Sequence, residues 1–193
     1  MRFNRRVVLA SSSPRRREIL EKLGVTFDII PSNADEDGVS GSADEIVIAL
    51  ARRKAESVAF GLTDALVIGC DTLVALGNDI FGKPGSAAQA EEMLRRLSAN
   101  THRVLSGLCL IDTATGSIRV SRDVTFVSFR ELTREEISVY AASGEPMDKA
   151  GAYAIQGGAG KFVSEVNGSY DNIVGFPSEL FLREARQMGI LED

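Results

Sequence analysis

The chain has 193 residues, a formal net charge of −5 and 44% hydrophobic residues. These values suit one compact domain, or one domain with two lobes, and they exclude a wholly disordered protein. An acidic chain is not typical of a protein that binds DNA or RNA irrespective of sequence, so we expect no nucleic-acid partner.

The sequence also predicts the compartment and the state of the cysteines. No stretch approaches the length of a membrane span, and the apolar run after the basic start is too short for a signal peptide. Cys70 and Cys109 lie in apolar runs without metal-ligand spacing, which favours reduced core thiols over a disulfide. We expect a cytoplasmic protein with no membrane partner.

Residues 7–24, VVLASSSPRRREILEKLG, predict a short buried strand at 7–10, a serine turn and a helix that begins at Pro14. Ser13 is a favourable N-cap, and proline is well tolerated at the first helical position. Gly24 ends the helix as a left-handed cap. The expected buried stripe consists of Ile19, Leu20 and Leu23.

The start of this helix combines positive charge with hydrogen-bond donors. Three consecutive serines, centred on Ser12, precede Arg15, Arg16 and Arg17. Because the helix dipole disfavours cations in the first turn, three arginines there indicate a bound anion, and a polyphosphate fits best. The alternative is a capped helix with a solvated basic first turn.

The chain then predicts a strand at 27–30, an acidic loop at 32–40 and a helix at 43–60 that is capped by Ser42. The loop carries Asp35 and Glu36. The late part of the helix carries Arg52, Arg53 and Lys54, a position that by itself suits basic residues.

Residues 66–76, LVIGCDTLVAL, predict a strand that is buried on both faces. Asp71 and Thr72 interrupt it. A buried carboxylate costs several kcal/mol in order of magnitude unless it meets a cation or donors. We interpret Asp71 as a functional residue, with a structural pairing to an arginine as the alternative.

The remaining elements alternate between strands and helices. In order, we expect a turn at Gly77 and Asn78, a loop with Lys83, a helix at 86–98, strands at 102–112 and 118–129, a helix at 133–142, a polar loop at 144–151 with Lys149, strands at 152–156 and 162–166, and a helix at 178–188. This order predicts an α/β fold with a mixed sheet and flanking helices, in a single domain over residues 1–193.

Several common catalytic sites are excluded. Residues 157–161 resemble a P-loop, but the motif would need glycine at Ile155 and serine or threonine at Phe162. No G-x-S-x-G elbow is present. His102 is the only histidine, so a zinc site rich in histidine is excluded, and a structural hydrogen-bonding role for His102 is favoured over catalysis.

Carboxylates and cations remain as the candidate chemical groups. Glu36 and Asp71, with Asp35 as a possible third, suit Mg²⁺, which prefers a few carboxylates, waters and substrate phosphates. Hydrolysis of a phosphoanhydride needs such a metal, a base, a water and cations for the phosphates. The candidate cations are Arg15, Arg16, Lys54, Lys83 and Lys149.

The motifs LASSSPRRREIL, GCDTLV, GKP, LSANTHRV, GEPMDKAGAYAIQG and NGSYDNIVGFP, together with the acidic loop, resemble the Maf family in order and over residues 9–177. The resemblance implies an inosine-triphosphatase-like fold with two lobes around a deep cleft. It also implies a nucleoside triphosphate pyrophosphatase that releases NMP and pyrophosphate, a divalent metal (Mg²⁺ or Mn²⁺) and a homodimer.

Thr72, the DKAG motif and Gln156 resemble the branch of the family that acts on dTTP and UTP. By resemblance, Asp71 is the proton acceptor; the specificity positions are Arg15, Thr72 and Gln156; and the catalytic pocket includes Glu36, Lys54 and Lys83. Ala99 and Ala154 replace glycines that are common in the family, which affects preference among pyrimidines rather than activity.

A glutamine amide matches uracil and thymine chemically, because it can accept from N3–H and donate to O4. We therefore expect hydrolysis between the α- and β-phosphates of dTTP or UTP, and removal of modified pyrimidine nucleotides. The first helix would bind the phosphates, with Ser12, Arg16 and Lys149 among the substrate contacts. Two alternatives are a non-catalytic regulator of cell division and an inosine triphosphatase that acts on purines.

Overall fold

The computed structural model describes residues 1–192 and has a mixed α/β architecture, as the sequence predicts. The chain divides into two compact units, the first formed by residues 1–71, 106–123 and 175–192 and the second by residues 72–105 and 124–174. The chain passes from one unit to the other within three long strands, which are β4 (Ala65–Leu76), β6 (Thr101–Asp112) and β7 (Ser117–Phe129), and again between Val174 and Gly175.

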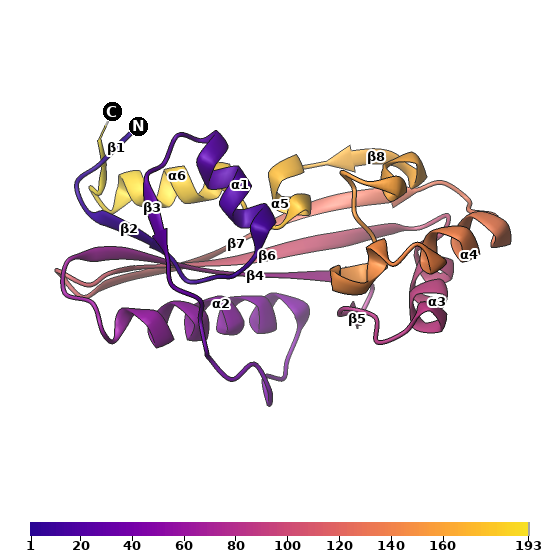
Figure 1. Cartoon of the computed structure of the whole chain (residues 1–193), viewed down its shortest axis with the longest axis horizontal. Helices are drawn as coiled ribbons and strands as arrows, with labels where there is room; N and C mark the ends of the chain where they lie inside the picture. The colour runs from indigo at the N-terminus through magenta and orange to yellow at the C-terminus, as the bar shows by residue number, and fades with distance from the viewer. Residues whose placement is uncertain (193) are drawn as a thin grey trace. The chain divides into compact units, whose positions relative to one another are not determined.

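In the first unit, the sheet has the order β3-β2-β4-β6-β7. Strand β2 is parallel to both neighbours, so Val8 pairs with Asp28 on one side and with Val67 on the other. Helices α2 and α6 cover opposite faces of this sheet (Figure 1). The remaining elements of the unit are β1 (Arg2–Phe3), β2 (Arg6–Leu9), α1 (Pro14–Lys22), β3 (Phe27–Ile29), α2 (Ala43–Ala59), α6 (Ser178–Gln187) and β9 (Leu191–Glu192).

Helix α2 lies unusually close to the sheet because two strands present glycine toward it. A Cβ atom on Gly69 of β4 would lie 2.2 Å from the carbonyl oxygen of Ala51. A Cβ atom on Gly107 of β6 would lie 2.1 Å from the carbonyl oxygen of Val47. The helix backbone therefore packs directly on the sheet, which fixes the register of α2 against β4 and β6.

The helix ends confirm most of the predicted caps. Ser42 and Glu45 form a complete capping box at α2, and Gly24 adopts a left-handed φ of 70° after α1. Ser13 is the N-cap of α1, but its side chain makes no capping hydrogen bond. Leu23, which the sequence placed in the core, is half-buried because it lies at the C-cap, where the helix ends.

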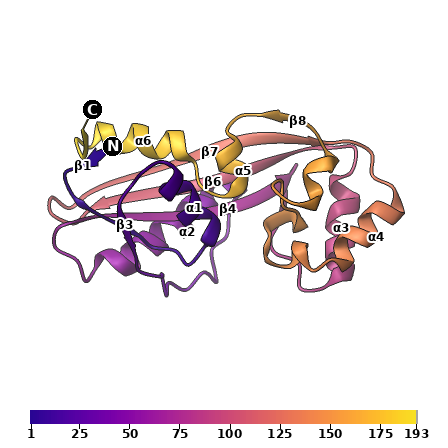
Figure 2. The ribbon, with the colours of Figure 1, turned by 45° about the horizontal axis from the view of Figure 1, so that its top comes forward.

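In the second unit, the sheet has the order β5-β4-β6-β7-β8, and helices α3 and α4 pack against each other (Figure 2). Gly77, with a φ of 59°, makes the predicted turn between β4 and β5. The remaining elements are β5 (Asp79–Phe81), α3 (Ala87–Leu97), α4 (Arg134–Ala142), the 3₁₀ helices η1 (Glu145–Asp148), η2 (Ala150–Ala152) and η3 (Gly158–Phe162), β8 (Val163–Asn167) and α5 (Tyr170–Val174).

The strand predicted at 152–156 is wrong. Ala152 ends η2 with a φ of 58°, and Gly151 before it has a φ of 69°. Two left-handed residues turn the chain away from an extended path. The main-chain N–H of Gly157 then donates to the carbonyl of Ala154 at 3.1 Å, so the segment ends in a tight turn.

None of the helices within residues 1–192 has the length and apolar character that a membrane span needs. Cys70 and Cys109 are buried thiols without a disulfide, as predicted.

His102 has the structural role that the sequence favoured. Its side chain is 1% exposed, its Nε2 is 2.8 Å from the hydroxyl oxygen of Tyr153, and its ring packs edge-on against Phe129 and Tyr153. Burial lowers the pKa of His102 from 6.5 to about 4, so the buried imidazole is neutral at physiological pH.

The close packing of α2 predicts that Gly107→Ala destabilises the protein by about 2 kcal/mol or more, because the added methyl group meets a main-chain carbonyl. Gly61→Ala is the matched control, since a Cβ there meets no heavy atom within 4 Å. Urea unfolding of both variants measures the difference. Equal free energies of unfolding for the two variants would contradict the close approach of α2 to the sheet.

The buried histidine predicts a specific dependence of stability on pH. The unfolded chain takes up a proton on His102 below about pH 6.5, whereas the folded protein does so only below about pH 4. The buried His102 therefore contributes fully to stability above about pH 6.5, and this contribution is lost as the pH falls toward about 4. The loss from about pH 7.5 to about pH 5 is about 2 kcal/mol.

His102→Gln removes this titration and keeps a group that can bond to Tyr153. Unfolding free energies at the two pH values, for the wild type and this variant, should show the smaller decrease in the variant. Parallel decreases would mean that His102 is protonated in the folded protein.

Candidate functional site

Asp71 is a buried carboxylate at the end of the apolar half of β4. Its Oδ1 lies 2.6 Å from the Nζ of Lys54, which extends from α2. The two side chains are only 10% and 12% exposed. The ion pair offsets the cost of placing a carboxylate in an apolar strand. It therefore explains how Asp71 can stay charged in this strand.

Lys54 also binds a second carboxylate. Its Nζ lies 3.1 Å from Oε1 of Glu36, whose side chain is 56% exposed. Glu36, Lys54 and Asp71, named here the Lys54 cluster, therefore run from the protein interior to the solvent within the first unit. The structure thus brings together three of the four residues that the sequence assigned to the catalytic pocket.

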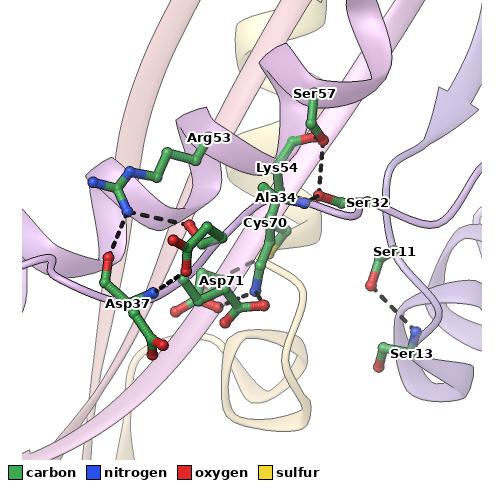
Figure 3. Close-up of polar contacts among 12 residues, drawn as sticks. Ser11, Ser13, Ser32, Ala34, Asp37, Arg53, Lys54, Ser57, Cys70 and Asp71 are labelled. Atoms are coloured by element: carbon green, nitrogen blue, oxygen red, sulfur yellow. Dashed lines mark hydrogen bonds and ion pairs between the residues drawn. The ribbon is translucent and has the colours of Figure 1, made fainter.

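The loop that carries Glu36 is held on α2 by its main chain. Nη1 of Arg53 donates to the carbonyl oxygens of Asp35 and Asp37, at 3.1 and 2.9 Å. The hydroxyl groups of Ser32 and Ser57 are 2.8 Å apart. In Figure 3, the side chains of Arg53 and Lys54 extend from α2 toward the loop.

The three basic residues of α2 thus have different partners. Arg52 makes an exposed ion pair with Glu56 at 2.7 Å, Arg53 binds main-chain carbonyls, and Lys54 binds two carboxylates. The sequence singled out only Lys54. A helical face that combines Arg53, Lys54 and Ser57 behind an acidic loop is the signal that could have identified Arg53.

The start of α1 has its own network in the first unit. Arg16 donates from Nε to the carbonyl of Gly175 at 2.9 Å and from Nη1 to Oγ of Ser11 at 3.1 Å. The same Oγ accepts from the N–H of Ser13 at 3.2 Å. Arg16 therefore fixes the first turn of α1 to the segment before α6, a contact that sequence reasoning did not foresee.

The other predicted residues of this turn have different environments. Ser12 is exposed and Arg15 is half-buried. Arg17 is exposed and pairs with Glu21 one turn later at 3.6 Å. Arg17 thus fits the alternative of a solvated basic residue.

The second unit carries the other predicted residues. Thr72 is half-buried in β4, and Gln156 is exposed in the turn before η3. Lys83 is exposed in the loop after β5, and that loop is joined to η2 because the N–H of Gly151 donates to the carbonyl of Gly82 at 3.1 Å. Lys149 is half-buried and pairs with the adjacent Asp148.

The candidate metal ligands of the sequence are the carboxylates of Asp35, Glu36 and Asp71. Within residues 1–192, no group of three or more His, Cys, Asp or Glu side chains is arranged to hold one. Asp35, the possible third ligand, accepts from the N–H of Asp37 with its Oδ1. Glu36 and Asp71 share the Lys54 ammonium.

Comparison with known proteins places the chain in a family. A family model described as Maf-like protein matches residues 6–188. A dTTP/UTP pyrophosphatase of Desulforamulus reducens is 43% identical over 187 residues, which cover 96% of this chain and 98% of the relative.

Two further relatives carry the same description. The dTTP/UTP pyrophosphatase of Pelotomaculum thermopropionicum is 47% identical over 172 residues, covering 89% of this chain and 90% of the relative. That of Bacillus cereus is 45% identical over 187 residues, covering 96% and 97%. The chain therefore belongs to the family of Maf-like proteins.

Proposed function

We propose that this protein is a pyrophosphatase that hydrolyses dTTP and UTP to the nucleoside monophosphate and pyrophosphate. Relatives with this description are 43% and 47% identical over most of the chain. The observation that carries the proposal is the Lys54 cluster, because it offers a buried base, a cation and a solvent-facing acid in one place. These are groups that hydrolysis of a phosphoanhydride needs.

Asp71 acts as the general base in this proposal. Lys54 contacts its Oδ1, so we assign Oδ2 to the proton of the attacking water. The water oxygen attacks the α-phosphorus. The bond from this phosphorus to the oxygen that bridges to the β-phosphate breaks, and pyrophosphate leaves. Lys54 and Lys83 offset the charge that develops on the bridging and leaving oxygens.

Substrate binding is assigned to the remaining candidates. Ser12, Arg15 and the N-terminal end of α1 bind phosphate oxygens, since N–H groups and arginine both favour anions there. Lys149 adds a further positive charge. Thr72 and Gln156 recognise the base, as the resemblance to the branch that acts on dTTP and UTP implies.

A divalent cation, Mg²⁺ or Mn²⁺, belongs to the proposal because two carboxylates suit an ion that the substrate brings. Glu36 and Asp71 would hold it. When bound, it would supply charge neutralisation for the phosphates and a preferred position for water.

The family resemblance adds three further elements to the proposal. We expect a homodimer, a cytoplasmic location and a role in removing modified pyrimidine nucleotides before polymerases use them. Sedimentation of the purified protein measures the first of these directly.

The proposed activity is tested by incubating the purified protein and Mg²⁺ with dTTP, UTP, GTP or ITP and measuring pyrophosphate. We expect turnover of dTTP and UTP, and a loss of at least about a hundredfold in Asp71→Asn, because an amide cannot take the proton. Circular dichroism verifies that the variant is folded.

The other possible results identify the alternatives. Preference for ITP would indicate an inosine triphosphatase, and no turnover of any nucleotide would favour a regulator without catalytic activity. Wild-type rates in Asp71→Asn would refute the role of Asp71.

The main-chain contacts of Arg53 predict that Arg53→Ala lowers kcat/KM by about tenfold, because a loop held less firmly positions Glu36 less accurately. Arg52→Ala is the matched control, since the adjacent arginine makes only an exposed pair with Glu56. Amide hydrogen exchange at residues 35–37 should become faster in the first variant only. Identical kinetics in the two variants would remove Arg53 from the account.

A further inference from the structure

The turn that carries Gln156 is fixed at two main-chain groups, one on each side of that residue. Two positions before it, the N–H of Ala154 donates to the hydroxyl oxygen of Tyr140 at 3.0 Å. Two positions after it, the N–H of Gly158 donates to both carboxylate oxygens of Glu145, at 3.2 and 3.1 Å. The side chain of Gln156 itself is exposed.

The carboxylate of Glu145 fills the space beneath this turn. A Cβ atom on Gly157 would lie 1.5 Å from Oε1 of Glu145, and one on Gly158 would lie 3.2 Å from Oε2. Glycine at 157 is therefore a condition for the contact between the carboxylate and the turn. The missing side chain at position 157 leaves the space that the carboxylate of Glu145 occupies.

Tyr140 and Glu145 also act on each other. Tyr140 is buried on α4 and packs edge-on against Phe162. Burial, the largest cause, and the nearby charge of Glu145 together raise the pKa of its phenol to about 12, against the opposing effect of the hydrogen bond from Ala154. The phenol is thus a neutral hydroxyl that accepts from the N–H of Ala154.

We propose that Tyr140 and Glu145, which no comparison assigns to the reaction, are positioning residues that set the selectivity for uracil and thymine over cytosine by holding the turn around Gln156. This inference rests on the proposed function. The inference extends that function by naming the residues that position the amide of Gln156, which recognises the base.

The chemical reason lies in the symmetry of an amide. With its carbonyl toward N3 and its amino group toward O4, glutamine matches uracil; a half-turn of the amide presents the reversed pair, which matches cytosine. This half-turn takes place about the side chain's own bond and needs no change of the backbone, but both bonds to uracil form only where the turn presents the amide at the right distance and angle. A loose turn weakens these bonds and the preference that they create. Selectivity therefore depends on the anchors as well as on Gln156.

The test compares kcat/KM for UTP with that for CTP in purified variants. We expect the wild type to prefer UTP, because CTP leaves polar groups of the site unpaired. Glu145→Ala should narrow the ratio of the two kcat/KM values by about tenfold or more, because the amide of Gln156 is then placed less accurately. Tyr140→Phe should narrow it less, because only one anchor is lost. Glu145→Gln, which retains an acceptor for the N–H of Gly158, should restore part of the ratio.

Two controls separate positioning from general damage. Glu135→Ala removes an exposed carboxylate from α4 of the same unit and should leave the ratio unchanged. Gln156→Ala should abolish most of the preference, and adding Glu145→Ala to it should then change the ratio little, because both act through one group. A merely structural role would lower kcat/KM equally for both nucleotides.

Failure of the inference and failure of the proposed function give different results. A wild type that hydrolyses neither UTP nor dTTP refutes the function. An active and selective wild type whose ratio is unchanged in Glu145→Ala, or in Gln156→Ala, overturns the inference alone. If Glu145→Ala does not fold, the ratios of Glu145→Gln and Tyr140→Phe decide, and wild-type ratios in both overturn it.

Discussion

The first unit is organised by the need to neutralise one buried carboxylate. Asp71 lies in a strand that is otherwise apolar, and an isolated charge there would cost several kcal/mol in order of magnitude. Lys54 provides the countercharge from α2 at 2.6 Å. A contact of this length requires the helix to lie at a fixed height and register over the strand.

Gly69 meets that requirement. It precedes Asp71 by two residues, so both residues present the same face of β4 toward α2. The missing side chain lets the backbone of Ala51 approach the strand, and Lys54 follows Ala51 by about one helical turn. The same pair of elements thus provides both the close packing and the ion pair, which explains why glycine stands in a buried strand where it would otherwise be unfavourable.

Much of this arrangement could be read from the sequence. Capping boxes, glycine turns and the long apolar strands follow local rules, so α2, α4, β4 and the pair of β6 and β7 lie close to their expected positions. Asp71 was conspicuous because a carboxylate interrupts an apolar run. Its partner was not predicted: an arginine was the expected structural partner, whereas Lys54 is 17 residues away on another element.

The errors have equally specific causes. Residues 152–156 alternate in a way typical of a strand, but the left-handed conformation of Ala152 has no sequence signal, because alanine rarely adopts it. The contacts of Arg53 and Glu145 escape prediction for another reason. Their partners are main-chain groups, which every residue carries, so nothing in the identity of Asp35 or Gly158 indicates them.

The two segments that carry candidate polar residues follow one physical rule. Arg53 binds the carbonyls next to Glu36, and Tyr140 and Glu145 bind the amides two positions from Gln156. A side chain that must meet a ligand cannot spend all its hydrogen-bonding capacity on the protein. The backbone on either side then determines where such a side chain is presented, and the main chain beside Glu36 and beside Gln156 is anchored.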